Sequence, residues 1–284
     1  MTKGTCAGIM LYNPDIERLT QNINAVLQQV DMIIFIDNAS TNTDELRKTF
    51  VDGRFAWINN SENRGVSGAL NQLVEFAAKN DFEWILTLDQ DSICGANLVN
   101  ELYGFIQNFD NVAMVSPRIV DRNLERIGVT YDIPSSQVEE ISMCITSGCL
   151  TSVKAILNLG GFNERLFIDQ VDHDMCLRLK RSGYRILRAN TVELLQEYGQ
   201  DTVRRKLLWK TIIYHIYPPM RIYYQTRNQL FMVRKYSHEF TEHPFKYALY
   251  LFIRFGVTFI YEPNRLKRLS AFIRGYVAGL LMKL

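Results

Sequence analysis

The sequence predicts an α/β fold, a mostly parallel sheet flanked by helices, with a helical extension at the C-terminus. Three observations predict it. Apolar runs alternate with helical patterns over the first 116 residues, as in chains whose parallel strands are joined by helices. At 284 residues and 47% hydrophobic content, the chain can bury one large core. From about Thr202 the chain is helical in pattern, aromatic and basic, so we expect a main domain over residues 1–202 and an extension over residues 203–284.

Each element of the main domain follows from its residue pattern. The apolar runs predict strands at Gly4–Leu11, Met32–Asp37, Phe55–Asn59, Trp84–Leu88 and Val112–Ser116. The stretches between them predict helices at Pro14–Gln29, Thr43–Phe50, Gly65–Lys79 and Gly95–Phe109. We expect the first helix to begin with Asn13 as its N-cap and Pro14 at its first helical position.

Further along the chain the alternation is lost. Residues 117–150 contain the turn-like Pro134-Ser135-Ser136, so irregular strands and loops are expected there. A helical segment follows from about Val171 to Ser182 and ends at Gly183. In parallel sheets, ligands bind beyond the carboxyl ends of the strands. Polar clusters that follow apolar strands are therefore the candidate site, and they are Tyr12-Asn13, Asp37-Asn38 and Asp89-Gln90-Asp91.

The charge of the chain is unevenly distributed. Residues 203–284 carry 15 Lys and Arg against three Glu, a net charge of +12, and the first 202 residues carry 17 against 27 acidic residues, a net charge of −10. This asymmetry predicts an acidic catalytic body and a basic tail that meets an anionic surface. An ordinary solvated basic face is the alternative.

Cysteine usage and the apolar segments indicate the compartment. The five cysteines have no CxxC spacing, which predicts reduced thiols in a cytosolic protein without a zinc site. Met1-Thr2-Lys3 runs directly into a predicted strand, so no signal peptide is expected. The apolar stretch from Tyr247 to Ile260 contains Arg254 and falls short of the roughly 20 residues that a membrane span needs.

The acidic pair Asp89 and Asp91 is the sharpest local feature of the sequence. It follows the apolar run Ile85–Leu88, and residues two apart in an extended strand point to the same face. Two carboxylates on one face suit Mg²⁺ or Mn²⁺, which take such ligands together with substrate phosphates. The alternative is an acidic pair that only solvates a loop.

Two further clusters suggest nucleotide binding. Asp37 in Asp37-Asn38-Ala39-Ser40 is able to accept a hydrogen bond from the imide of uracil or thymine, although Asp, Asn and Ser also favour capping and turns. Asn63-Arg64-Gly65 opens a predicted helix whose N-terminal N–H groups suit phosphate, with Arg64 adding a charge-assisted bond. An ordinary helix start is the alternative for this second cluster.

A second acidic cluster surrounds Asp172. We expect Asp172 to face the site from the start of a helix and to take a proton from an attacking hydroxyl group. The alternative is that Asp169, Asp172 and Asp174 offset the helix dipole. Near the extension, Arg221, Tyr224, Arg227 and Asn228 are spaced to share a helix face, and the arginines are suited to neutralise a diphosphate leaving group.

Taken together, the motifs resemble those of the inverting glycosyltransferases of family 2, which share the GT-A fold. The resemblance covers about residues 5–235 and implies the roles of individual residues. Tyr12, Asp37 and Asn38 would contact the nucleobase side of the donor, with Asn63, Arg64 and Gly65 forming its N-x-G turn. The remaining matches are the D-x-D at Asp89, Gln90 and Asp91, the base Asp172, and the acceptor-side residues Ser147, Gly148, Asp169 and Gly160-Gly161-Phe162.

Within that family, three longer strings look like bacterial rhamnosyltransferases. They are Leu88–Ser92, Phe167–Arg178 and Arg221–Asn228. This likeness implies dTDP-L-rhamnose as the donor, bound also by Gln90, Arg227 and Asn228, with Mg²⁺ or Mn²⁺ on Asp89 and Asp91. It also implies a lipid-linked saccharide acceptor in cell-surface polysaccharide synthesis, and no nucleic acid partner.

Two positions depart from the family pattern. Val171 stands where the family has a Glu before the base, and Gln196 stands where it has a His in L-x-H-x-x-G, here Leu194–Gly199. If that His helps to hold the metal, this chain binds metal weakly or uses Arg227 instead. A UDP-hexose donor, a non-catalytic nucleotide-sugar-binding protein and a dehydrogenase are the rival interpretations, and the absence of G-x-G-x-x-G counts against the last.

The basic tail predicts peripheral contact with the inner face of the plasma membrane. A pair of amphipathic helices would lie in the interface of an anionic membrane with its basic residues toward the headgroups. Those residues are Lys246, Arg254, Arg265, Lys267, Arg268 and Arg274. A homodimer surface made by the same apolar residues is the alternative.

Overall fold

The structure is a computed structural model that describes residues 4–129, 134–197, 201–207, 210–237, 256 and 264–284. The chain divides into two compact units. The first consists of residues 1–165 and 171–197, and the second consists of residues 166–170 and 198–284. Each unit is described in turn.

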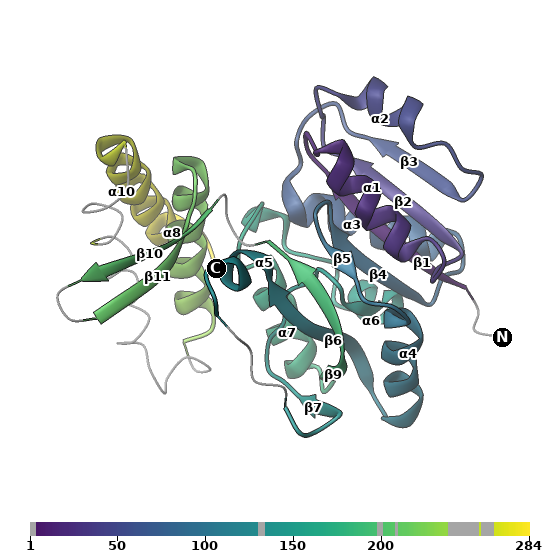
Figure 1. Cartoon of the computed structure of the whole chain (residues 1–284). Helices are drawn as coiled ribbons and strands as arrows, with labels where there is room; N and C mark the ends of the chain where they lie inside the picture. The colour runs from purple at the N-terminus through teal and green to yellow at the C-terminus, as the bar shows by residue number, and fades with distance from the viewer. Residues whose placement is uncertain (1–3, 130–133, 198–200, 208–209, 238–255, 257–263) are drawn as a thin grey trace. The chain divides into compact units, whose positions relative to one another are not determined.

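The first unit is built on one large sheet. Among the described residues the sheet has nine strands, with the order β3-β2-β1-β4-β8-β6-β9-β5 and with β7 paired to β9 (Figure 1). The strands are β1 (Thr5–Leu11), β2 (Met32–Asp37), β3 (Phe55–Asn59), β4 (Trp84–Asp89), β5 (Ile93–Cys94), β6 (Val112–Asp121), β7 (Val138–Glu140), β8 (Leu150–Ser152) and β9 (Arg185–Gln196). The first four strands in the spatial order are parallel to one another, whereas β8 is antiparallel to both of its neighbours. The predicted mostly parallel sheet is therefore confirmed.

The register of the parallel strands aligns their carboxyl ends. Leu11, the last residue of β1, pairs with Asp37 at the end of β2. On the other side of β1, Met10 pairs with Asp89 at the end of β4. The polar clusters that follow these strands therefore emerge along one edge of the sheet, as predicted.

Helices cover both faces of this sheet (Figure 1). They are α1 (Ile16–Val26), α2 (Thr43–Thr49), α3 (Gly65–Lys79), α4 (Leu98–Asn108), α5 (Arg122–Arg126), α6 (Val153–Asn158) and α7 (Val171–Arg181), with the 3-10 turn η1 (Glu164–Leu166) before α7. Buried side chains of α1 and α4, among them Leu19 and Leu98, share one apolar cluster with Ile9, Phe35 and Leu88 of the sheet. Burying the apolar surface of such residues is the main favourable term for the fold.

Two local predictions for the first unit differ from the structure. The N-cap of α1 is Asp15, whose carboxylate accepts from Arg18 N at 2.9 Å. Asn13 instead has a left-handed backbone. Its side-chain oxygen accepts from Thr41 N, in the loop after β2, at 2.7 Å, so it is used to hold that loop and does not cap the helix. The region expected to be irregular contains the end of β6, α5, β7 and the start of β8. The 12-residue strand β9 was not predicted at all.

The second unit contains a hairpin and two helices. Its elements are β10 (Asp201–Leu207), β11 (Lys210–Ile216), α8 (Pro219–Lys235) and α10 (Arg265–Leu281), with β10 and β11 antiparallel. The prediction of helix from Thr202 onward was wrong for the hairpin, where β-branched residues such as Val203, Thr211 and Ile212 favour strands. Helices α8 and α10 confirm a helical C-terminal extension.

Helices α8 and α10 pack closely through small residues. A Cβ on Gly275 would lie 2.5 Å from the carbonyl oxygen of Tyr223, so only glycine permits this approach. Arg268 is buried and donates to the carbonyl oxygen of Tyr217, which contradicts the expectation that this residue faces headgroups. No described helix is long and apolar enough to cross a bilayer. Apart from Gly256, the apolar stretch Tyr247–Ile260 lies outside the described residues, as does Lys246.

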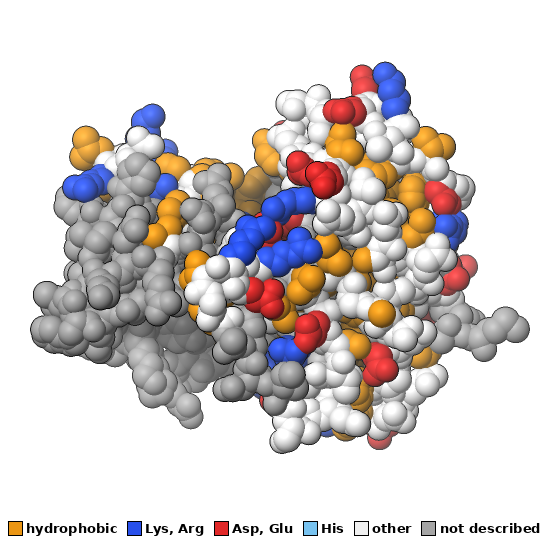
Figure 2. Space-filling model, viewed as in Figure 1, with side chains coloured by type: hydrophobic (Ala, Val, Ile, Leu, Met, Phe, Trp, Pro, Cys, Tyr) orange, Lys and Arg blue, Asp and Glu red, His pale blue; other side chains and the backbone are white. Residues whose placement is uncertain are grey.

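The surface of the first unit carries mixed charge. On the face seen in Figure 2, acidic and basic side chains are interspersed with apolar ones. Several charged side chains of the first unit pair directly, for example Arg185 with Glu140 at 3.0 Å and Arg188 with Glu139 at 2.6 Å. The net negative charge of this part of the chain therefore does not form a continuous acidic field on that face.

Candidate active site

The acidic pair lies on a turn at the end of β4. The strand ends at Asp89, and Ser92 N donates to the carbonyl oxygen of Asp89 at 3.3 Å to close the turn. The expectation that an extended strand carries both Asp89 and Asp91 was therefore wrong, because the chain must reverse to pair β5 with β9. The two carboxylates are nevertheless close. Burial raises the pKa of Asp91 to about 6, and the charge of Asp89 adds to the rise.

A buried amide network orients the Asp89 carboxylate. Gln196, at the end of β9, donates from Nε2 to Asp89 Oδ2 at 2.7 Å. The other end of the same amide, Oε1, accepts from the Ser92 hydroxyl and from Ser147 Oγ, the latter at 3.2 Å. Because both hydroxyl groups are buried and donate to Oε1, the N–H side of Gln196 has to face Asp89. Position 196, a departure from the family pattern, thus contacts the acidic pair directly.

One loop links the acidic pair to Asp172. Thr146 donates from Oγ1 to Asp172 Oδ1 at 3.0 Å, and its neighbour Ser147 accepts from Asp89 N at 3.0 Å. The loop is fixed on β4, since Gly148 N donates to Thr87 O at 2.7 Å. Gly148 has a φ of +79°, and a Cβ there would lie 2.9 Å from Pro117, so the turn requires glycine. Asp89 and Asp172 therefore contact adjacent residues of a single loop.

The three aspartates around Asp172 have different surroundings. Asp174 is fully buried and forms an ion pair with Arg178 one helical turn later, at 2.8 Å. Arg178 also donates to the carbonyl oxygens of Leu159 and Gly161, at 3.0 and 2.7 Å. This fork ties α7 to the end of α6, so Asp174 has a structural role. Asp172 remains at the first turn of α7 with Thr146 as its partner.

The predicted nucleobase residues lie where β1 and β2 end. Tyr12 is 51% exposed, and its backbone N donates to Gln90 Oε1 at 2.9 Å, which joins the ends of β1 and β4. Asp37 is buried, and its two oxygens accept from Ser40 N at 3.0 Å and from the Thr43 hydroxyl. The carboxylate thus organises the turn after β2. Its role toward a nucleobase stays a prediction.

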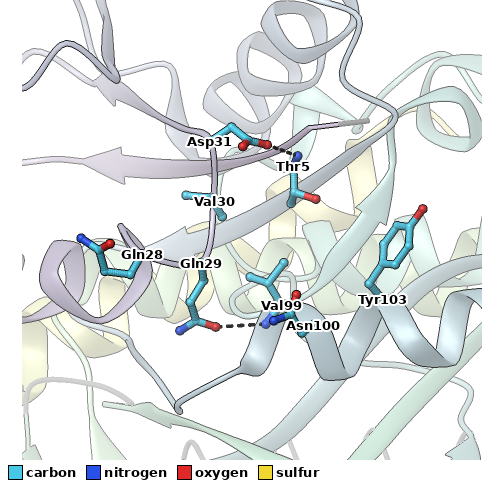
Figure 3. A pocket seen from close by; sticks show the side chains of 8 residues that line it. All are labelled: Thr5, Gln28, Gln29, Val30, Asp31, Val99, Asn100 and Tyr103. Atoms are coloured by element: carbon cyan, nitrogen blue, oxygen red, sulfur yellow. Dashed lines mark hydrogen bonds between the residues drawn. The ribbon is translucent and has the colours of Figure 1, made fainter. Parts of the chain in front are cut away.

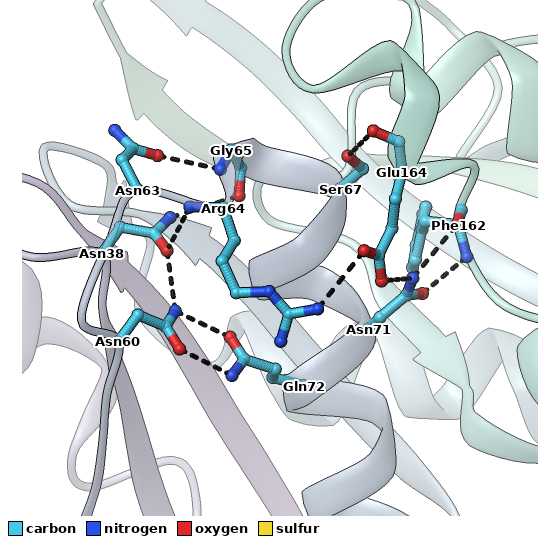
Figure 4. Close-up of polar contacts among 10 residues, drawn as sticks. All are labelled: Asn38, Asn60, Asn63, Arg64, Gly65, Ser67, Asn71, Gln72, Phe162 and Glu164. Carbon is cyan, nitrogen blue, oxygen red and sulfur yellow. Dashed lines mark hydrogen bonds and ion pairs between the residues drawn. The ribbon is translucent and has the colours of Figure 1, made fainter.

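The second predicted cluster forms an amide network between β2 and α3 (Figure 4). Asn38 Nδ2 donates to Gly65 O at 3.2 Å, and Asn38 Oδ1 accepts from Asn60 at 2.8 Å. Asn63 Oδ1 accepts from Gly65 N at 2.8 Å, so one of the N–H groups at the start of α3 already has a partner. Arg64 pairs with Glu164 of η1 at 3.3 Å. Donor binding by these residues stays a prediction.

The predicted residues of α8 lie against a loop of the second unit. Asn228 is fully buried, and its Nδ2 lies 2.7 Å from both Leu166 O and Ile168 O. Arg227 donates to Leu166 O at 3.0 Å, and Arg221 pairs with Asp169 at 3.1 Å. In this structure these side chains hold the loop that precedes α7. Their contact with a donor stays a prediction, as does the acceptor-side role of Asp169.

Two positioning contacts were missed by the sequence reasoning. Asn22 is fully buried on α1 and donates to Asp89 O at 2.7 Å, which fixes the end of β4. A polar residue within the apolar stripe of Leu19, Ile23 and Val26 was a signal that could have revealed it. Thr146 gave no comparable signal, because its contact with Asp172 depends on the path of an irregular loop.

An ion-pair cluster lies next to the acidic turn. Glu197 follows β9 and pairs with Arg18 of α1 and, at 3.3 Å, with Arg126 of α5. The hydrogen bond that Arg18 donates to the Glu197 carboxylate raises the pKa of Arg18, and the charge of the Asp91 carboxylate contributes to the same shift. This cluster therefore brings basic side chains into the electrostatic environment of the acidic turn.

A pocket of about 170 Å³ lies at the opposite edge of the sheet (Figure 3). Thr5 at the start of β1 and Asp31 just before β2 are among its lining residues, and Thr5 N donates to Asp31 at 2.9 Å. Gln29 also lines it and accepts from Val99 N at 3.1 Å. These residues lie at the amino ends of the strands, so the pocket is separate from the acidic turn.

Comparisons with known proteins agree with this geometry. Residues 6–159 match the family described as glycosyl transferase family 2, and residues 84–281 match glycosyl transferase family group 2. The dTDP-rhamnosyl transferase RfbF of Shigella flexneri is 25% identical over 247 residues, which cover 83% of this chain and 81% of the relative.

Solved structures share the fold at low sequence identity. The structure of S. aureus TarS 1–349 in complex with UDP-GlcNAc aligns with a TM-score of 0.59 and 12% identity, over 96% of this chain and 81% of that chain. GalNAc-T7 with UDP, GalNAc and Mn²⁺ aligns with a TM-score of 0.55 and 13% identity, over 68% of this chain and 44% of that chain. This chain therefore spans less than half of GalNAc-T7.

The first unit is thus a GT-A fold with an acidic turn at the carboxyl ends of its parallel strands. Because the first family match spans more than half of its length, the chain belongs to glycosyltransferase family 2.

Proposed function

We propose that this chain is an inverting glycosyltransferase that transfers L-rhamnose from dTDP-L-rhamnose to a lipid-linked glycan. The observation that carries the proposal is the loop Thr146-Ser147, which contacts Asp172 on one side and Asp89 on the other. A single displacement needs a base for the attacking hydroxyl and charge stabilisation for the leaving group at opposite sides of one sugar. A loop that contacts a candidate for each role supports the proposal.

In this mechanism Asp172 accepts the proton of the acceptor hydroxyl as that oxygen attacks the anomeric carbon. Thr146 donates to Asp172 Oδ1, which orients the carboxylate. The bond between the anomeric carbon and the diphosphate breaks in the same step, so the configuration inverts. Arg227 is proposed to assist the departure of dTDP, and the N-x-G turn at Asn63, Arg64 and Gly65 to bind the donor.

The residues of the acidic turn fit a divalent cation. Asp89 and Asp91 would hold Mg²⁺ or Mn²⁺. Burial first and the charge of Asp89 second raise the pKa of Asp91, and a bound cation would offset both effects. The described residues contain no cluster of three or more His, Cys, Asp or Glu that could hold a metal. Diphosphate oxygens would therefore complete the coordination, as is usual for Mg²⁺. When bound, the cation would neutralise charge on the leaving diphosphate.

The choice of donor is supported by one relative. RfbF is named a dTDP-rhamnosyl transferase, and the string Arg221–Asn228 carries the sequence likeness to rhamnosyltransferases. A UDP-hexose is the rival donor, since the TarS and GalNAc-T7 structures contain UDP or a UDP-sugar. We propose that the enzyme works at the inner face of the plasma membrane, where a lipid-linked acceptor is exposed.

A donor screen tests the proposal. Purified protein is incubated with dTDP-L-rhamnose, UDP-glucose or UDP-GlcNAc and Mn²⁺, and hydrolysis and transfer are scored. We expect dTDP-L-rhamnose to be used, and Asp172→Asn to lower transfer by about 10²- to 10⁴-fold while dTDP affinity is retained. The exposed Asp44→Asn serves as the matched control. Turnover of a UDP-sugar alone would overturn the donor assignment, and normal turnover by Asp172→Asn would overturn the base.

A further inference from the structure

The loop 166–170 has an unfavourable backbone. Phe167, Asp169 and Gln170 have φ values of 62°, 64° and 65°, in the left-handed region that side chains other than glycine rarely adopt. Such a run persists only where the surroundings hold it in place, and it is a reason to look for a function. The next residue, Val171, begins α7, and Asp172 is the second residue of that helix.

Helix α8 holds the backbone of this loop. Nδ2 of Asn228 lies within 2.9 Å of three carbonyl oxygens, those of Leu166, Ile168 and Asp169. Its other amide atom, Oδ1, accepts from Arg227 Nε at 2.8 Å, so the orientation of the amide is fixed. Asn228 is fully buried. One side chain therefore satisfies most of the carbonyl groups that the distorted loop exposes.

Helix α8 also holds the side chains of the loop. Arg221 pairs with Asp169 through two nitrogens, Nε and Nη2, at 3.2 and 3.1 Å. The ring of Tyr224 stacks on that of Phe167, with the centroids 4.9 Å apart and the planes at 18°. Gln170 donates to Gln229 at 2.9 Å. The loop accordingly belongs to the second unit, although the first unit flanks it in sequence on both sides.

We propose that Asn228 and Arg221 are positioning residues for Asp172. By holding the loop 166–170 in its unfavourable conformation, they set the direction in which the chain passes from Gln170 into Val171 and Asp172, the first two residues of α7. This inference rests on the proposed role of Asp172 as the base. It assigns Arg221 and Asn228 to the geometry of the base, and it explains why the amide of Asn228 is buried against main-chain oxygens.

The test separates positioning from donor binding. Asn228→Asp keeps the size of the side chain but replaces two N–H donors with a carboxylate that faces carbonyl oxygens. We expect kcat to fall by about 10- to 100-fold, the scale of a small displacement of a catalytic group. The affinity for dTDP, measured by calorimetry, is expected to change by less than about threefold. Thr226→Val is the control, because Thr226 is buried on the same helix and its hydroxyl donates within that helix, to Ile222 O.

A charge exchange provides an independent measurement. Arg221→Asp places two carboxylates together and Asp169→Arg places two guanidinium groups together, so each is expected to lower kcat. The double variant restores the pair with its charges reversed and is expected to recover most of the loss. A double variant no more active than either single variant would contradict the role of Arg221.

The outcomes also distinguish this inference from the proposed function. If Asp172→Asn is inactive while Asn228→Asp has wild-type kcat, the base assignment stands and the positioning role is wrong. If Asn228→Asp weakens dTDP binding in proportion to its loss of kcat/KM, Asn228 contacts the donor instead. If Asp172→Asn turns over normally, the proposed base is wrong and the positioning role falls with it. Unchanged circular dichroism of each variant is required before its kinetics are compared.

Discussion

Gln196 donates from Nε2 to Asp89 Oδ2 at 2.7 Å, across 107 positions of sequence. Its carbonyl end accepts from the hydroxyls of Ser92 and Ser147, so the amide cannot turn its oxygen toward the acidic turn without losing these bonds. An N–H group cannot be a metal ligand. In this arrangement position 196 orients a carboxylate of the acidic turn, and Asp89 and Asp91 stay the proposed ligands for a cation.

Gln196→Ala is expected to weaken Mn²⁺ binding in the presence of dTDP by about 10- to 100-fold, the usual cost of removing a group that orients a metal ligand. Electron paramagnetic resonance of Mn²⁺ measures this without reliance on turnover. Gln29→Ala is the matched control, because Gln29 makes similar amide contacts, with Gly95 O and Val99 N, at the opposite edge of the sheet. Equal Mn²⁺ affinity of wild type and Gln196→Ala would show that Asp89 does not depend on this amide.

Asp91→Asn is expected to stabilise the metal-free protein at pH 7.5 by about 1–3 kcal/mol. Burial and the charge of Asp89 raise the pKa of Asp91 from 3.8 to about 6, so the folded state binds the proton more tightly than the unfolded state. The free energy of unfolding therefore falls as the pH rises from about 4 to about 6, and the ionised carboxylate costs its full amount above that window.

Urea denaturation in EDTA at pH 5.0 and 7.5 measures this effect. Asp91→Asn should be the less pH-dependent protein over the window, whereas Asp44→Asn, on an exposed residue of α2, should behave as wild type. If the free energy of unfolding depends on pH in the same way for wild type and Asp91→Asn, ionisation of Asp91 does not lower the stability of the folded state.

The parts of the site that follow from local sequence were the predictable ones. An apolar run followed by Asp89 predicts the end of a buried strand, and the register of Asp37 and Asp89 beside β1 follows from a parallel sheet. The partners of these residues were not predictable, because Gln196 and Thr146 reach them through tertiary contacts. Strand β9 was missed since its polar positions, such as Arg188 and Asn190, interrupt the apolar pattern, and these positions pair with the loop before β7 and with β7 itself.

Arg178→Ala is expected to destabilise the first unit by about 3–5 kcal/mol, the cost of removing one partner of a buried ion pair. The change removes the guanidinium from the fully buried Asp174 and from the carbonyl oxygens of Leu159 and Gly161. Arg178→Lys keeps the charge without the planar fork, so a smaller loss is expected.

Chemical denaturation measures both variants of Arg178. Arg181→Ala, at an exposed position of the same helix, should change the free energy of unfolding by about 0.5 kcal/mol or less. If Arg178→Ala unfolds at the wild-type denaturant concentration, the ion pair with Asp174 does not hold α7 in place.

The exposed apolar residues of α10 are expected to bind an anionic membrane. Ile273, Tyr276, Val277 and Leu280 are 45–52% exposed and recur at helical spacing, and Arg265, Lys267 and Arg274 on the same helix supply positive charge. Such a helix lies in the interface with its apolar face among the acyl chains.

A triple variant with Ser at Ile273, Val277 and Leu280 should lose flotation on phosphatidylglycerol vesicles, and the wild type should not float on phosphatidylcholine alone. Replacing the exposed Val51 and Leu157 of the first unit with Ser should leave flotation unchanged. Should the triple variant float normally but sediment as a monomer where the wild type is a dimer, the same residues form a dimer surface instead.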